Sequence, residues 1–178
     1  MKKLRVGGLC SGVGGIELGF KKAGFDIAWA NDSDMHAMKT YQSVHRSNHY
    51  IDSNPYTIRE IIDNPELAKL VTDIDILASG FPCQPFSIAG HRKGLTDERG
   101  TVIEDIFDFI SKFGRPKVLF LENVKNFRNH DNGNTFKLIS KRLRKDFNYS
   151  VCDLILNAAD YTKIPQNRER TFLICFKD

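Results

Sequence analysis

Short apolar runs alternate with longer segments of helical period along this sequence. Strands are predicted near residues 4–10, 25–31, 49–52, 74–79, 117–122, 149–157 and 171–176. Helices are predicted near residues 15–23, 34–44, 65–71, 101–113 and 135–146. This order predicts an α/β fold with a doubly wound, mostly parallel, Rossmann-like sheet, because parallel strands need helical crossovers. No helix is predicted between the last two strands, so we expect them to pair as antiparallel strands at one edge.

The composition fits one compact domain over residues 1–178. Hydrophobic residues make up 41% of the chain, which is enough to fill a single core and argues against disorder. The net charge of +4 is compatible with a polyanionic partner without demanding one. Four cysteines form no CxxC pair, so we expect no metal site and a reducing, cytoplasmic setting. No apolar stretch approaches the ~18 residues that cross a bilayer, so no membrane association is expected.

A glycine-rich turn lies between the first predicted strand and the first predicted helix. Its backbone can approach a ligand at the start of the helix; its residues are Cys10, Ser11, Gly12, Val13, Gly14 and Gly15. The full dinucleotide fingerprint is missing, because position 17 is glutamate, and tight packing of strand on helix is the competing interpretation.

The end of the second predicted strand carries acidic residues about 20 positions beyond these glycines. In a nucleotide-binding fold a carboxylate there accepts hydrogen bonds from ribose hydroxyls, which favours Asp32 as a cofactor residue. The alternative is that Asp32 or Ser33 caps the following helix. Together the turn and the acidic strand end favour a nucleoside-containing cofactor.

Residues at three further strand ends suggest chemistry. Cys83 lies in a long loop, residues 80–100, where an accessible thiol can act as a nucleophile, although a buried and inert cysteine is the common alternative. Glu122 ends an apolar strand and is a candidate general acid, with helix capping by Asn123 as the competing interpretation. Strand alternation sends Arg168 and Arg170 to one face, which a solvated edge would explain equally well.

Taken in order, these segments closely resemble the DNA cytosine-C5 methyltransferase family. The resemblance rests on residues 9–15, the run Gly-Phe-Pro-Cys-Gln-Pro-Phe-Ser at 80–87, Asp-Glu-Arg-Gly at 97–100, Leu-Glu-Asn-Val at 121–124 and Gln-Asn-Arg-Glu-Arg at 166–170. These motifs are jointly specific and span nearly the whole chain.

The resemblance implies methyl transfer from S-adenosylmethionine to carbon 5 of a cytosine flipped out of double-stranded DNA. It implies that Cys83 attacks carbon 6, that Glu122 contacts ring nitrogen 3, and that Arg170 and Arg168 contact the base or the nearby backbone. Asn123 would hold the loop geometry. The residues implied to bind the cofactor are the turn from Cys10 to Gly15, Asp32, Ser33, Asp52, Gly80, Pro82 and Val102.

The sequence also departs from the family pattern. Cys10 and Ser33 stand where larger side chains are common, and Asp52 lies outside the usual Gly-Asp-Ile context. No target-recognition region and no closing block follow Phe176, so we expect one subunit of a split restriction-modification enzyme, completed by a second subunit. The alternatives are a catalytically silent remnant that binds cofactor or DNA, an RNA cytosine methyltransferase and, more distantly, a nicotinamide-dependent dehydrogenase.

Overall fold

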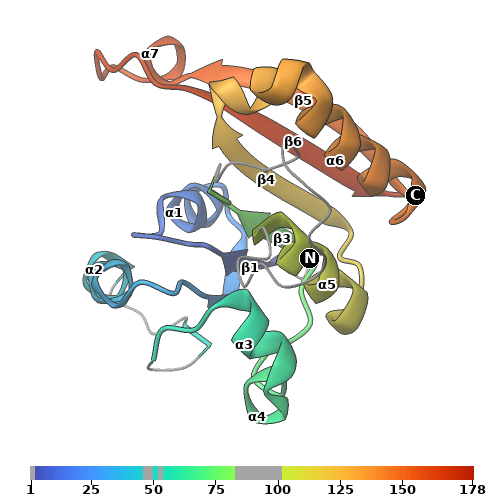
Figure 1. Ribbon diagram of the computed structural model, residues 1–178. Coiled ribbons are helices and arrows are strands. Elements are labelled where there is room, and N and C mark those ends of the chain that lie inside the picture. The colour runs from blue at the N-terminus through green and yellow to red at the C-terminus, as the bar shows by residue number, and fades with distance from the viewer. Residues whose placement is uncertain (1–2, 46–49, 52–53, 83–101) are drawn as a thin grey trace.

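A six-stranded mixed sheet organises the protein (Figure 1). The computed structural model describes residues 3–45, 50–51, 54–82 and 102–178. The strand order is β2-β1-β3-β4-β6-β5, with the strands β1 Arg5–Leu9, β2 Asp26–Ala30, β3 Ile76–Ser79, β4 Val118–Val124, β5 Tyr149–Asn157 and β6 Glu169–Lys177. Pairs from β2 to β4 are parallel, whereas β6 runs antiparallel to both β4 and β5. The predicted α/β fold is therefore confirmed, and the reversed strand is β6, one place in from the edge.

Helices connect these strands, and several match the predicted positions. The helical segments are α1 Gly15–Lys22, α2 Met35–His45, α3 Ile58–Asp63, α4 Pro65–Ala68, α5 Val102–Phe113, the 3-10 segment η1 Lys125–Gly133, α6 Asn134–Lys145 and α7 Ala158–Tyr161. None of those in the described ranges is long and apolar enough to cross a membrane.

Three local predictions need correction. The strand predicted at 49–52 is reduced, in its described part, to a single parallel bridge between Tyr50 and Ala30. Helix α3 was not expected, although Thr57 and Glu60 form a reciprocal capping box at its start. The connection between β5 and β6 contains the short helix α7, which Asn157 caps through a hydrogen bond from the Ala159 N–H.

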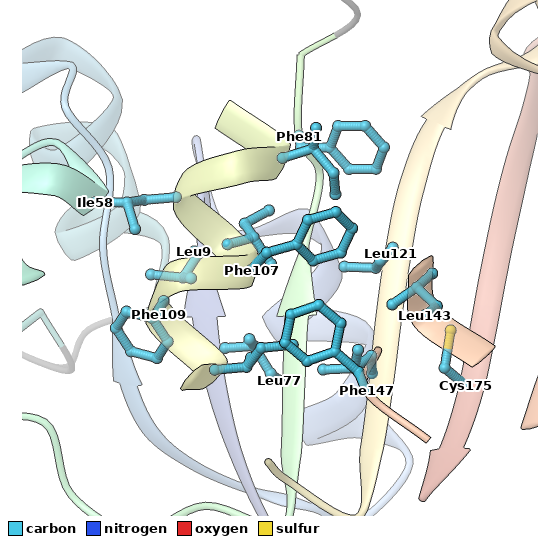
Figure 2. Close-up of a cluster of buried hydrophobic side chains, with 14 of the residues drawn as sticks. Leu9, Ile58, Leu77, Phe81, Phe107, Phe109, Leu121, Leu143, Phe147 and Cys175 are labelled. Carbon is cyan, nitrogen blue, oxygen red and sulfur yellow. The ribbon is translucent and has the colours of Figure 1, made fainter. Parts of the chain in front are cut away.

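The main hydrophobic core lies between the sheet and the helices α5 and α6. Phe107 of α5 points toward Leu121 of β4, and its ring stacks on that of Phe147 at a centroid distance of 5.1 Å (Figure 2). On the opposite face, Phe20 of α1 packs edge-on against Phe120 of β4 at 5.2 Å. This packing fixes the carboxyl ends of β1, β3 and β4 side by side, where the predicted site residues lie.

Candidate active site at the carboxyl edge of the sheet

The glycine-rich turn presents bare backbone at the start of α1. Cys10, Gly12 and Gly14 adopt positive φ angles of 52°, 55° and 85°. Gly14 is the N-cap of α1, and no side chain caps the helix, so its first amide groups are left for a ligand. A Cβ at Gly14 would lie 2.1 Å from His45 Nε2, so only glycine fits this position.

Asp32 is tied to this turn by hydrogen bonds. Its carboxylate accepts from the Gly12 N–H at 2.7 Å and from the Asp34 N–H at 2.9 Å. Helix α2 is capped instead by Asp34, which accepts from the N–H groups of His36 and Ala37. The alternative in which Asp32 or Ser33 caps this helix is therefore wrong. Asp32 holds the turn at the carboxyl end of β2, and Ser33 is exposed.

Glu122 and Arg170 face the turn from β4 and β6. In the antiparallel register Arg170 lies opposite Val124, which places its side chain diagonally next to Glu122 on the same face. Arg170 Nε lies 2.9 Å from Glu122 Oε1, and both side chains are about one fifth exposed (22% and 19%). Gly80 separates this pair from the turn: a Cβ there would lie 3.3 Å from Glu122 Oε2 and 3.8 Å from the Cys10 carbonyl.

Asn123 points to the other face of β4 and is 3% exposed. Its amide nitrogen donates to the Phe81 carbonyl at 3.0 Å, and its side-chain oxygen accepts from the Val124 N–H at 2.8 Å. It does not cap η1, whose N-cap is Val124. Asn123 therefore fixes the segment that leads into Pro82, which is exposed, and Cys83; Cys83 and Asp52 lie outside the described residues.

Arg168 and Glu169 follow the predicted strand alternation. The exposed Arg168 lies on the same side as Arg170, whereas Glu169 forms an ion pair with Lys125 at 2.7 Å. The backbone N–H of Arg168 donates to Asn157 Oδ1 at 3.0 Å, which ties the two ends of the β5–β6 connection together.

One hollow of about 750 Å³ joins these groups. The predicted site residues that line it are Cys10, Ser11, Val13, Gly15, Gly80, Glu122, Arg168 and Arg170. Val102, at the start of α5, does not line it. Two lining residues were missed: Asn157, and Tyr161, whose side chain is 72% exposed. A tyrosine in a polar connection carries no periodic signal, so the sequence did not single it out.

Burial sets the electrostatics beneath the turn. It raises the pKa of Cys10 to about 12, and the nearby Asp32 adds to the shift, so this thiol is protonated and a poor nucleophile. Burial also raises the pKa of Glu17, which is 1% exposed and has one carboxylate oxygen without a hydrogen-bond partner. Glu17 was noted only as the residue that breaks the dinucleotide fingerprint.

Comparison with known proteins identifies the family. A family model described as C-5 cytosine-specific DNA methylase matches residues 4–178. The chain belongs to this family. It is 44% identical over 178 residues to the type II methyltransferase M.Bsp6I of Bacillus sp. (strain RFL6), and 39% identical over 175 residues to M.HhaI of Haemophilus parahaemolyticus.

Solved structures agree with this assignment. A putative DNA modification methyltransferase encoded within an E. coli prophage superposes with a TM-score of 0.71 at 28% identity, over 98% of this chain and 47% of that one. The S. pombe Dnmt2 methyltransferase, with a TM-score of 0.69 at 23% identity over 98% and 51% of the two chains, shows the shared fold. The chain, at 98% coverage, spans only 53% of M.Bsp6I and 50% of M.HhaI.

Proposed function

We propose that this chain carries the cofactor-binding and catalytic part of an enzyme that methylates carbon 5 of cytosine in double-stranded DNA. The observation that carries the proposal is the single hollow that joins the glycine-rich turn to Glu122 and Arg170. A methyl donor and a flipped base must meet in one water-poor space, and this arrangement offers one.

The turn fits S-adenosylmethionine. Positive φ angles at Cys10, Gly12 and Gly14 expose backbone amides, and Gly15 and Gly80 leave the lining free of side chains. The Asp32 carboxylate, at the end of β2, is our candidate for the ribose hydroxyls. When bound, this cofactor supplies an electrophilic methyl group. We also assign cofactor contacts to Ser33, Asp52, Pro82 and Val102, although the last lies outside the hollow lining.

The protein's own groups would activate the base. The Cys83 thiolate forms a bond to carbon 6 of cytosine, while Glu122 donates a hydrogen bond to ring nitrogen 3 and so draws electrons toward the ring. Carbon 5 then becomes nucleophilic and accepts the methyl group. Loss of the proton from carbon 5 and breakage of the bond between Cys83 and carbon 6 restore the aromatic ring. Arg170 holds Glu122 in place and, with Arg168, balances charge near the base oxygen.

We further propose that activity requires a region beyond these residues. The relatives are about twice as long as the matched part, and the family's sequence-reading region would lie in the remainder. In the split form that we favour, a second subunit supplies that region. The expected result is little transfer of tritiated methyl by this chain alone, and site-specific labelling of duplex DNA when the complementary region is added.

A covalent trap tests the nucleophile. Duplex DNA that contains 5-fluorocytosine blocks the final proton loss, so the complete enzyme with S-adenosylmethionine is expected to form an adduct that survives denaturation. Cys83→Ser should abolish the adduct, whereas the matched control Cys152→Ser, at an exposed cysteine of β5, should retain it. An adduct that survives Cys83→Ser would show that the nucleophile is wrong. An RNA substrate in a parallel arm separates DNA from RNA methylation.

A further inference from the structure

The two faces of the sheet are covered unequally over the strands β4, β6 and β5. On one face, α6 and α5 bury Leu121, Leu173 and Cys175 almost completely. On the other face α1 packs on β1 to β3 and reaches β4 through Phe20. Within the described part of the chain, no helix covers this face of β6 and β5.

The uncovered face is apolar. Strand register aligns its side chains in cross-strand rows: Phe120, Ile174 and Cys152 form one row, and Phe172 and Leu154 extend the next. The rings of Phe120 and Phe172 lie 5.4 Å apart, and Phe176 and Leu154 are 52% and 40% exposed. Exposed apolar side chains in such a continuous patch mark a contact surface.

The dimensions of this face fit one helix. Three strands spaced about 4.8 Å apart span about 10 Å between the outer axes, which is close to the ~10 Å diameter of an α-helix. A helix lying there would continue the layer that α1 begins, and sheets of this class bury both faces under helices.

The hollow and the uncovered face are continuous. Phe20, Phe120, Phe172 and Leu156 line the same hollow as the glycine-rich turn and Glu122. Whatever packs on these side chains therefore forms a wall of the space assigned to the cofactor and the base.

We propose that this face, defined by Phe120, Cys152, Leu154, Leu156, Phe172, Ile174 and Phe176, is the docking surface for one amphipathic helix from the half of the family's length that this chain does not span. The proposal rests on the proposed function in one respect, namely that the docked helix also closes the side of the hollow where cofactor binds. Docking and cofactor binding are then coupled, and each tightens the other.

A second copy of this chain fits less well. The lining of the hollow contains the carboxylate of Glu122, which is already paired with Arg170, whereas Arg168 lies exposed at its rim. Two copies meeting through this face would bring two Arg168 side chains together, and like charges oppose such a contact.

Direct binding tests the proposal. The probe is the part of M.Bsp6I that this chain does not match, expressed as a separate polypeptide and titrated calorimetrically into a Cys83→Ser chain. This background removes turnover, so a failure of catalysis does not affect the result. Leu154→Lys and Phe176→Lys change exposed positions, and a circular dichroism spectrum checks that both variants fold.

We expect a complex that each of these two variants weakens by at least about tenfold. The matched control Leu138→Lys, at a 49% exposed leucine on α6, should change the dissociation constant by less than about twofold. The probe should also tighten S-adenosylmethionine binding. Absence of a complex, equal weakening by all three variants, or a dimer of this chain that Leu154→Lys dissociates would each overturn the proposal.

Discussion

The two walls of the hollow are built by different means. The cofactor wall is backbone, shaped by residues in the left-handed region and pressed from behind by His45 and Tyr41. The opposite wall is an ion pair between side chains of two antiparallel strands. The first wall has no space for added atoms, whereas the second can keep its shape when its charge changes. Substitutions should therefore affect folding at the first wall and chemistry at the second.

The largest effect is expected from Gly14→Ala. The new methyl group would meet His45 Nε2 at 2.1 Å and the Tyr41 ring at 2.6 Å, at a φ of +85° that alanine disfavours. We expect a loss of about 3 kcal/mol or more in the free energy of unfolding, together with loss of cofactor binding, measured by urea denaturation and calorimetry. Gly19→Ala in α1 is the control, because nothing lies within 4 Å of its Cβ position. It should stabilise the helix by up to about 1 kcal/mol, and equal destabilisation by both changes would contradict the steric argument.

Glu122→Gln tests the second wall. The amide keeps the shape of the side chain but removes the acid, so methyl transfer by the complete enzyme should fall about 100-fold. The free energy of unfolding should change by no more than about 1 kcal/mol, because the pair is partly solvated. Glu169→Gln breaks the neighbouring pair with Lys125, away from the hollow, and should leave the transfer rate within about twofold. If both variants lose activity equally, the role assigned to Glu122 is wrong.

The smallest effect concerns Glu17 beneath the first wall. Burial raises the pKa of Glu17 above its ordinary value of 4.5, so above that pH the unfolded chain releases a proton that the folded chain keeps. The stability that depends on the neutral carboxyl is thus complete at pH values below 4.5 and is lost as pH rises toward the raised pKa. Glu17→Gln should unfold at a higher urea concentration relative to the unmodified chain at pH 8 than at pH 5. A constant difference between the two proteins would show that Glu17 does not titrate in this range.

The cofactor wall could be predicted from the sequence, and the geometry of the second wall could not. Strand, glycines and helix are contiguous around Gly12, so local pattern alone places the turn. The contact between Glu122 and Arg170 depends on the register of two strands that are far apart in sequence, which alternation does not set. Local signals were also overlooked: Thr57 and Glu60 announce α3. By contrast η1 is polar and contains Asp131 and Asn132 at positive φ, so it has no periodicity to detect.

The position of β6 has a consequence for how the chain folds during synthesis. It is the last strand in chain order, yet it hydrogen-bonds to β4 on one side and to β5 on the other. While residues 169–177 are still inside the ribosome, β4 and β5 have no strand between them, although the glycine-rich turn has already emerged. A nascent chain can therefore shape its cofactor wall early, whereas Glu122 gains Arg170 only when the sheet is completed. The step that finishes the fold is also the step that assembles the acid.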